Sequence, residues 1–498
     1  MTGPEHPDRA HTGSAQADPD ERRTRLLAAA AISLRGYSDI LVPLGKLFTT
    51  AGRDLFLVGG SVRDAVLGRL SNDLDFTTDA RPDEVIALVT GWADAIWDAG
   101  IEFGTVSIRK ADLIIEITTY RAEAYDRVGR NPVVTFGDTL DGDLIRRDFT
   151  VNAMAVRIGP DGAQEFCDPL DGLSALLAGI IDTPATPQES FDDDPLRMLR
   201  AVRFVSQLGF RLAPRVVDAI TEMNGQIERI TAERVRVELD KLICGEHPID
   251  GLEIMVDTGL ADRVMPEIPG MKLTIDEHHQ HKDVYQHSLT VLRQAIDLEE
   301  SDPDPVLRWA ALLHDIGKPA TRRHEVGGGV SFHHHEVVGA KMVRKRMRAL
   351  KYPKAMVEDV ATLVFLHLRF HGYGDGAWTD SAVRRYVTDA GDLLERLNKL
   401  VRADCTTRNK RRARRLQENY DDLERRIAEL KAAEDLGRVR PDLDGNAIME
   451  LLGLRPGREV GEAWKYLKEL RLDRGPLPRE EAEAELLRWW AARSSGNE

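Results

Sequence analysis

Two aspartates separated by one residue, Asp73 and Asp75, are the side chains of this sequence with the most evident chemical use. The two-residue repeat of a β-strand places both carboxylates on one face and the apolar Leu74 and Phe76 on the other. Neighbouring carboxylates repel each other unless a cation lies between them. Sites of phosphoryl transfer usually bind Mg²⁺ through one or two carboxylates together with the phosphates of the substrate. The pair therefore predicts a Mg²⁺ site.

The segment before these aspartates predicts a phosphate-binding turn. The mostly apolar run DLFLV, residues 54–58, indicates a buried strand that ends in a tight turn at Gly59 and Gly60. Ser61 is the predicted N-cap of a short helix that carries Arg63. Backbone N–H groups at the start of that helix and the arginine suit a triphosphate. A surface turn and solvated acids would explain each feature alone, but their order and spacing resemble the nucleotidyltransferase superfamily that includes DNA polymerase beta.

Helical patterns run through residues 22–51, and a further helix is expected over residues 83–93. Two β-rich segments, residues 103–110 and 112–121, then predict a hairpin. Alternation along the second segment makes Glu116 a candidate third carboxylate for the metal. The alternative is a solvated strand glutamate, which is the more common case.

The run RRDFTVNAMA, residues 146–155, holds a second group of polar candidates. The Arg147 guanidinium can hold phosphate through a forked pair of hydrogen bonds. The Asp148 carboxylate can accept a hydrogen bond from a ribose hydroxyl, which would select ribonucleotides. A surface cluster of ion pairs explains the run equally well.

Four charged residues recur every three positions in DDPLRMLRAVRF, and they are Asp194, Arg197, Arg200 and Arg203. On a helix such neighbours touch while the row slants around the axis, as in an ordinary amphipathic helix with salt bridges. Cytosine and adenine each present an amino donor beside a ring-nitrogen acceptor. A carboxylate and a guanidinium, Asp194 and Arg197, could therefore select CTP and ATP without a template. The two later arginines would reach phosphate or the second base edge.

Residues 40 to about 275 resemble a class II tRNA nucleotidyltransferase, the CCA-adding enzyme family. The resemblance depends on VGGSVRDAVLGR with DLDF, RRDFTVNAMA, DPLDGLSALLAG, DDPLRMLRAVRF and ERVRVELDKLICGEHPIDGLEIMVDTGL. It implies that Gly60 and Arg63 hold the triphosphate, that Asp73 and Asp75 bind Mg²⁺, that Arg147 and Asp148 contact phosphate and ribose, and that Asp194, Arg197, Arg200 and Arg203 bind the nucleotide. One departure is Asp193, where many family members have glutamate.

Eleven of the fourteen histidines fall between His278 and His371. Imidazole and carboxylate are good ligands for a divalent transition metal, and the adjacent His314 and Asp315, flanked by apolar residues, are expected on a helix facing a bundle interior. The set resembles the HD phosphohydrolase superfamily, with His287, His314, Asp315 and Asp404 as ligands and His335 and His367 as additional candidates. An active domain of this kind would hydrolyse a phosphoester, such as a terminal or cyclic phosphate on damaged tRNA.

Composition limits the remaining possibilities. At 498 residues the chain is too long for a single hydrophobic core, so several domains are expected. The three dispersed cysteines argue for a reducing compartment. No apolar run is long enough for a membrane, so a cytoplasmic protein is expected. The chain has 68 Lys and Arg against 83 Asp and Glu, a net charge of −15, so any RNA contact must come from local basic patches such as residues 408–415. A helix over residues 418–436 is expected to follow this basic run.

The predicted fold is an α/β nucleotidyltransferase head with a small mixed sheet, followed by all-α neck, body, HD and tail domains. The expected order is a disordered tail (1–21), the head (22–170), a neck and body that read the base and contact tRNA (171–275), the HD domain (276–415) and a helical tail that contacts tRNA (416–498). The predicted activity is template-independent addition and repair of the 3′-terminal CCA of tRNA from CTP and ATP, releasing pyrophosphate. A poly(A) polymerase, a CC-only or A-only enzyme, and an inactive RNA-bound head beside a working HD phosphohydrolase stay open, as does the oligomeric state.

Overall fold

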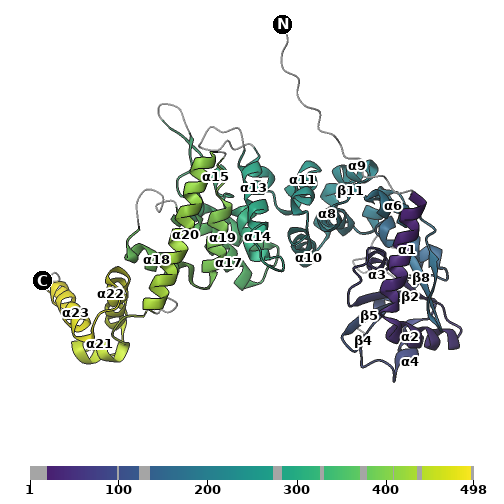
Figure 1. Ribbon diagram of the computed structural model, residues 1–498, viewed down its shortest axis with the longest axis horizontal. Coiled ribbons are helices and arrows are strands. Elements are labelled where there is room, and N and C mark those ends of the chain that lie inside the picture. The colour runs from purple at the N-terminus through teal and green to yellow at the C-terminus, as the bar shows by residue number, and fades with distance from the viewer. Residues whose placement is uncertain are drawn as a thin grey trace, which may run out of the picture. The chain divides into compact units, whose positions relative to one another are not determined.

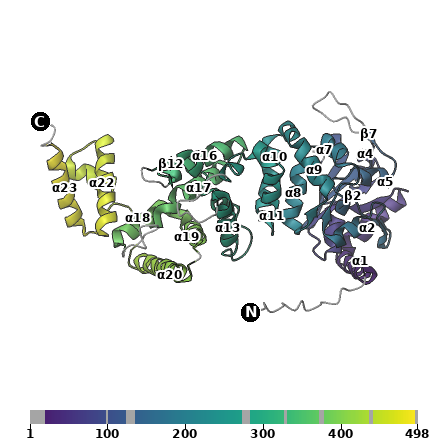
Figure 2. The same ribbon diagram turned by 90° about the horizontal axis from the view of Figure 1, so that it is seen from above.

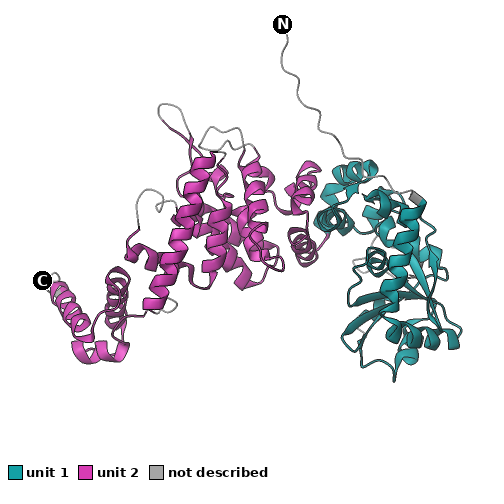
Figure 3. Cartoon of the chain, in the orientation of Figure 1, with its two compact units in different colours: residues 1–229 teal, residues 230–498 magenta. Residues whose placement is uncertain are grey.

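The computed structural model describes residues 19–97, 100–122, 135–272, 283–325, 330–370, 378–407, 409–434 and 440–494 (Figure 1). The chain divides into two compact units, Met1–Arg229 and Ile230–Glu498 (Figure 3). The boundary between them falls inside the predicted neck and body. Most of the tail predicted as disordered lies outside the described residues, which start at Pro19 with helix α1.

A seven-stranded sheet in the order β3-β4-β5-β2-β1-β8-β9 is the framework of unit 1. Its strands are β1 (Leu55–Val58), β2 (Asp73–Thr78), β3 (Ala95–Trp97), β4 (Thr105–Lys110), β5 (Leu113–Thr119), β8 (Ala155–Gly159) and β9 (Gly162–Cys167). Strands β4 and β5 confirm the predicted hairpin, which turns at Ala111 with a φ of +53°. The sheet is mixed as predicted, because β2 pairs with β5 in parallel and the other neighbours are antiparallel.

Helices form where the sequence pattern predicts them, with differences in their ends. The helical patterns expected over residues 22–51 form two helices, α1 (Pro19–Arg35) and α2 (Ser38–Thr50). The expected helix over residues 83–93 is α4 (Pro82–Val89), which ends before the positive φ of Gly91. Helix α2 buries Leu44 and Phe48 and packs against β8 and β9.

No single helix among the described residues has both the length and the apolar character needed to cross a membrane; α1 and α2 meet that test only together, as a pair bent by 86°.

Short helices complete unit 1 around and after the sheet. They are α3 (Gly60–Val66), α5 (Leu140–Ile145), α6 (Gly172–Ala178), α7 (Pro187–Asp193), α8 (Leu196–Leu208) and α9 (Pro214–Met223). A parallel pair of two-residue strands, β10 (Ile180–Ile181) and β11 (Arg211–Leu212), fixes the two ends of the segment that contains α7 and α8. Helix α8 therefore has a fixed place within the unit that holds the sheet.

Unit 2 is almost entirely helical, as predicted. Its helices are α10 (Ala232–Ile243), α11 (Pro248–Asp257), α12 (Leu260–Val264), α13 (Val284–Ile296), α14 (Pro305–Leu313), α15 (Lys318–Thr321), α16 (His335–Ala349), α17 (Lys354–Leu366), α18 (Asp380–Ala390), α19 (Leu394–Ala403), α20 (Lys410–Ala433), α21 (Gly445–Leu452), α22 (Arg458–Arg474) and α23 (Arg479–Ser494). Helices α13, α14, α16, α17 and α19 form a bundle that Figures 1 and 2 show from two directions.

The basic run and the helix expected after it form one continuous helix, α20. Arg408 lies outside the described residues, and the Asn409 side chain accepts hydrogen bonds from the first backbone N–H groups of the helix. Leu423 and Ile427 are buried against the bundle. The residues of the basic run are good helix formers, so the exposed positive charge does not interrupt the helix.

Two candidate functional sites

Asp73 and Asp75 lie on β2 as the alternation predicts. Leu74 and Phe76 are buried on the opposite face, whereas Asp73 is exposed and Asp75 is half-buried. Glu116 on β5 is the register partner of Asp75, so parallel pairing brings a third carboxylate beside the pair. The two neighbouring interior strands therefore concentrate negative charge at one place.

This crowding changes the acidity of Asp75. Burial raises the pKa of Asp75, and the neighbouring Glu116 raises it further, whereas Arg147 lowers it. Such a carboxylate gains from a cation nearby. Two groups of three histidine or carboxylate side chains bring their ligand atoms within 4.8 Å of one another in the described part of the chain, and neither contains Glu116. The metal role of Glu116 stays a prediction.

The turn before the aspartates differs from the prediction in one detail. Helix α3 begins at Gly60, and its N-cap is Gly59, so the prediction that Ser61 caps it was wrong. Gly59 has a φ of +67°, a conformation that favours glycine and starts the helix early. Ser61 instead ties α3 to β2, since its Oγ accepts from Asp75 N–H at 3.0 Å and donates to Asp73 O at 3.2 Å.

Arg147 approaches this turn from the other side. A Cβ added at Gly59 would lie 3.0 Å from Arg147 Nη1 and 3.7 Å from Asp75 Oδ2. Arg147 Nη2 donates to Asp143 at 3.0 Å, while its Nε is buried with no hydrogen-bond partner among the described residues. The guanidinium is thus held beside the predicted metal and phosphate positions.

A chain of hydrogen bonds joins α3, which follows the glycine turn, to α8. Arg63 Nη1 donates to Asn152 Oδ1 at 2.7 Å, and Asn152 Nδ2 donates to Asp148 Oδ1 at 3.0 Å. Arg200 Nε donates to Asp148 Oδ2 at 2.9 Å. The Arg63 Cζ also lies 5.1 Å from the ring centroid of Phe204 on α8. The two predicted halves of the nucleotide site therefore meet within unit 1.

Sequence reasoning missed Asn152 as the connecting residue. Its signal was its place in RRDFTVNAMA, four residues after Asp148, but nothing local shows which side chain it contacts. Burial alone would raise the pKa of Asp148, yet the Arg200 charge and the Asn152 hydrogen bond hold it at about 2. The carboxylate is thus an ionised acceptor, and its predicted contact with ribose stays a prediction.

The four charged residues that recur every three positions do not all lie on one helix, because the first of them precedes α8 and the three arginines lie on it. Asp194 lies before α8, at the C-terminal end of α7, and its Oδ1 accepts from Leu196 N–H at 3.1 Å. Arg197 donates to Ser190 Oγ at 2.8 Å and to the Arg146 carbonyl at 2.7 Å. Reading of the base by Asp194 and Arg197 stays a prediction.

Arg203 closes the row on the inner side of α8. It is buried, donates to Gln207 Oε1 at 3.2 Å and places its Cζ 4.0 Å from the ring centroid of Phe204. Phe204 therefore contacts both Arg203 and Arg63 and helps to connect the row with the turn.

The second site unites all six residues predicted for the HD domain. They are His287 on α13, His314 and Asp315 after α14, His335 at the start of α16, His367 after α17 and Asp404 after α19. Two groups form, one of His287, His314 and Asp404 and one of Asp315, His335 and His367. The prediction that His314 and Asp315 lie on a helix was wrong, because α14 ends at Leu313 and both residues occupy the following turn.

Backbone hydrogen bonds determine which imidazole nitrogens face the centre. Nδ1 of His314, His335 and His367 lies 2.8, 2.8 and 2.6 Å from the carbonyl oxygens of Ala311, Phe332 and Val364. A neutral ring that donates from Nδ1 carries its lone pair on Nε2. The Nε2 atoms of His335 and His367 are 3.3 Å apart, and those of His287 and His314 are 3.1 Å apart. Burial lowers the pKa of His314, but Asp315 and Asp404 raise it to about 9. A cation shared by these facing nitrogens would therefore displace a ring proton.

Carboxylates hold negative charge inside this cluster. Burial would raise the pKa of Asp315, but His314 and Lys318 keep it well below its ordinary value. Burial likewise opposes ionisation of Asp404, yet His314 and His287 lower its pKa. Lys318 Nζ lies 2.9 Å from Asp315 Oδ2, and sequence reasoning missed it although it follows Asp315 by three residues.

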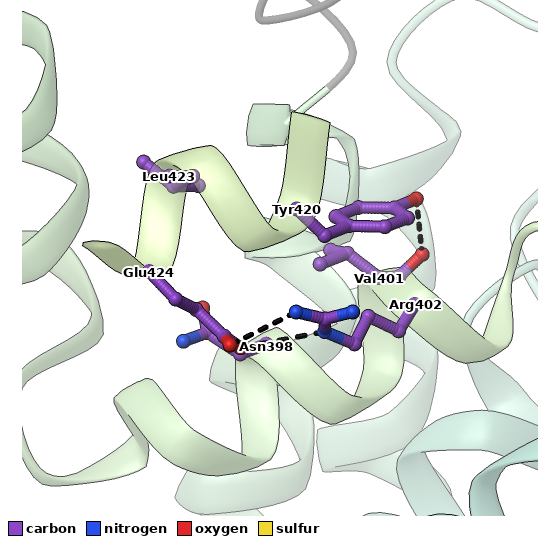
Figure 4. Close-up of a pocket in the computed structure, with 6 residues that line it drawn as sticks. All are labelled: Asn398, Val401, Arg402, Tyr420, Leu423 and Glu424. Atoms are coloured by element: carbon purple, nitrogen blue, oxygen red, sulfur yellow. Dashed lines mark hydrogen bonds and ion pairs between the residues drawn. The ribbon is translucent and has the colours of Figure 1, made fainter. Parts of the chain in front are cut away.

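Packing of α19 on α20 supports the segment that carries Asp404. Tyr420 donates from its hydroxyl to the Val401 carbonyl at 2.7 Å, and Arg402 donates to Glu424 at 2.9 Å (Figure 4). Thr406, which follows Asp404 by two residues, lies with its Oγ1 3.3 Å from His287 Nδ1. These contacts orient two candidate metal ligands from distant segments of the chain, Asp404 after α19 and His287 on α13.

Comparison with known proteins identifies the family. Residues 55–182 match the Poly A polymerase head domain, residues 209–271 match a probable RNA and SrmB-binding site of polymerase A, and residues 284–428 match the HD domain. An A-adding tRNA nucleotidyltransferase of Deinococcus radiodurans is 33% identical over 454 residues, covering 87% of this chain and 95% of the relative. The chain belongs to the tRNA nucleotidyltransferase family.

Other members of the tRNA nucleotidyltransferase family match over different lengths. A CCA-adding enzyme of Levilactobacillus brevis is 38% identical over 262 residues, which is 52% of this chain and 64% of that enzyme. The crystal structure of the Bacillus stearothermophilus CCA-adding enzyme in complex with CTP superposes with a TM-score of 0.67 at 25% identity, covering 91% of this chain and 98% of that one. The predicted family and fold class are therefore confirmed.

Proposed function

We propose that unit 1 adds the 3′-terminal CCA of tRNA, without a template, from CTP and ATP and with release of pyrophosphate. The observation that carries this proposal is the chain of contacts from Arg63 through Asn152 and Asp148 to Arg200. This chain of contacts supports a common site for the predicted phosphate-binding turn and the predicted base-reading helix, and Ser61 of the same turn helix bonds to the aspartate strand. A single nucleotide triphosphate can then contact all three.

The side chains have separate roles in this reaction. Asp73 and Asp75 would hold Mg²⁺, which neutralises phosphate charge and makes the RNA 3′-hydroxyl easier to deprotonate. Arg147, fixed by Asp143 beside the turn, orients the triphosphate. Asp194 accepts from the amino group of cytosine or adenine. Positioning and charge neutralisation supply most of the rate, so no covalent enzyme intermediate is needed.

Arg197 keeps N–H groups that can donate to the base of the nucleotide. Its guanidinium donates to Ser190 and to the Arg146 carbonyl, which fixes its plane and leaves further N–H groups for a ring nitrogen. Uracil and guanine would set an N–H against these donors and leave buried groups unpaired, which is costly. This asymmetry supports selection of CTP and ATP.

A-only addition is the second candidate function. The relative named A-adding matches 87% of this chain, whereas the Levilactobacillus CCA-adding enzyme matches 52%. Both activities need the same aspartates, arginines and α8, so the site geometry suits either one.

The product sequence decides between these activities. Purified protein is incubated with tRNA that lacks its CCA end and with tRNA that ends in CC, each with CTP, ATP or both. CCA addition predicts two cytidines from CTP alone, CCA from both nucleotides, and one adenosine on the CC end. An A-only enzyme extends only the CC end, and a poly(A) polymerase continues past one adenosine.

We also propose that the HD site of unit 2 hydrolyses a phosphoester on tRNA 3′ ends. Its support is the convergence of four histidines and two aspartates, with ring nitrogens oriented by backbone carbonyls. One or two divalent transition metals would fit these ligands and would polarise the scissile phosphate and activate water. Lys318 then balances charge beside Asp315.

The test for the HD site uses tRNA that ends in a 2′,3′-cyclic or terminal phosphate, with Ni²⁺, Mn²⁺ or Mg²⁺ added to metal-free protein. Metal-dependent phosphate release supports the proposal. No release with any of the metals contradicts it.

A further inference from the structure

A hollow of about 450 Å³ lies in unit 2, and none of its lining residues is a candidate ligand of the HD cluster. Its walls come from α18, from α22 and from Arg369, which follows α17. Arg385 on α18 donates to Glu469 at 2.7 Å and to Asp473 at 2.8 Å on α22, so the two helices are fixed to each other. The hollow is therefore a built feature between paired helices.

Positive charge exceeds negative charge along the walls. The lining includes Arg369, Arg385, Lys465 and Lys468 against Asp389 and Glu469. Arg369 pairs with Asp389 at 3.3 Å and Arg385 pairs with Glu469, whereas Lys465 and Lys468 pair with no carboxylate in the described part of the chain. In a chain with a net charge of −15, two uncompensated lysines in one hollow indicate an anionic ligand.

Two exposed aromatic rings accompany these cations. Trp464 lines the hollow and is 38% exposed, and Lys468 Nζ lies 5.7 Å from the centroid of its ring. Phe365 is also 38% exposed, and Arg369 Cζ lies 6.0 Å from its ring centroid. An exposed aromatic face beside cations is able to stack on a nucleic-acid base.

We propose that this hollow binds one unstacked nucleotide of an RNA strand, with the base against Trp464 and the flanking phosphates against Lys465 and Lys468. The inference rests on the proposed function, because the RNA is the tRNA substrate. A volume of about 450 Å³ falls in the range of about 300–1,000 Å³ that small-ligand sites occupy. Aromatic faces beside unpaired lysines are the combination that binds single-stranded nucleic acid.

Trp464→Ala tests the stacking contact. We expect the full-length variant to bind tRNA that lacks its CCA end about fivefold more weakly or worse, because a stacked base contributes about 1 kcal/mol or more. Trp464→Tyr keeps a stacking face and should restore most of the affinity. Fluorescence anisotropy with labelled tRNA measures both, and equal unfolding temperatures show that the exposed ring is not needed for folding.

The double variant Lys465→Ala and Lys468→Ala tests the phosphate contacts. Its plot of log binding constant against log salt should be shallower by about 1.5, because each lost phosphate contact removes about 0.7–0.9 of slope. Lys341→Ala with Lys345→Ala on α16 is the matched control, since both lysines are exposed and the charge change is identical. The control should keep the slope of the natural protein.

Three results would overturn the proposal: unchanged tRNA affinity in Trp464→Ala, an equal loss in the control, or a loss of CTP or ATP binding without a loss of tRNA binding. Nucleotide incorporation at saturating tRNA should persist in the variants. If the natural protein binds tRNA but adds no nucleotide, the proposed function fails while the binding comparison still decides this site.

Discussion

The two sites use carboxylates in opposite surroundings. In unit 1, Asp73 is exposed and Asp75 is half-buried on β2, and the charges around Asp75 come from Glu116 as well as from Arg147 and Arg63. In unit 2, Asp315 is buried among imidazoles whose Nδ1 atoms contact backbone carbonyls. In the proposed reaction, a triphosphate would complete the first arrangement by bringing oxygen ligands for the metal and negative charge for the arginines. The second already has its nitrogen and oxygen ligands in place.

This difference indicates two ways of using a metal. A strand that carries two aspartates suits a cation that arrives with its nucleotide, as Mg²⁺ commonly does. A buried set of histidines suits a more firmly held transition metal. Variants that separate the two activities test whether the sites are in fact independent.

The largest effect is expected for Asp73→Ala. Loss of a metal ligand should lower incorporation of labelled CTP and ATP into tRNA by about 1,000-fold or more, since the metal supplies several kcal/mol of transition-state stabilisation. Asp112→Ala, on the turn between β4 and β5, is a control that removes an exposed acid of the same sheet. HD phosphatase activity should not change. Incorporation near the natural rate would place the metal site elsewhere.

His314→Ala should have the converse effect. It removes one ligand of the HD cluster, so we expect metal affinity and metal-dependent phosphatase activity to fall by about 100-fold or more. His324→Ala, which changes an exposed histidine on β12 (Arg323–His324), is the matched control. CCA addition should continue in both variants. Phosphatase activity that survives in His314→Ala would show that another site performs it.

Asp194→Ala should change base choice more than overall rate. Removal of the acceptor for the amino group should reduce discrimination of CTP against UTP by about 10- to 100-fold, the range for a lost polar contact in a base-reading site. Competition between labelled CTP and UTP measures it. Asp193→Ala provides an adjacent exposed control, and an identical preference in both variants would contradict base reading by Asp194.

Asp148→Asn has the smallest expected effect, on stability. The folded-state pKa of about 2 lies below the ordinary value of 3.8, so the ionised carboxylate stabilises the fold above about pH 4, and this stabilisation disappears as the pH falls toward 2. The variant should lose about 2 kcal/mol at pH 7 in urea unfolding, followed through the unit 1 transition. The difference from the natural protein should vanish near pH 2. A difference independent of pH would mean that the Arg200 pair is not its cause.

Local patterns determined a large part of this molecule. The alternation of Asp73 and Asp75 with Leu74 and Phe76 was predictable because a strand repeats every two residues whatever it pairs with. The hairpin of β4 and β5 followed for the same reason. Helix ends were predicted less well, because α3 begins one residue before Ser61, where Gly59 can adopt a positive φ.

Only the tertiary structure decided which distant groups meet. Parallel pairing of β2 with β5 put Glu116 beside Asp75, and Asn152 became the link between Arg63 and Asp148. The grouping of the HD ligands into two clusters depends in the same way on five helices that are far apart in sequence. Backbone geometry acts between neighbouring residues, whereas these contacts arise from the packing of whole elements, which leaves no periodic signal in the chain.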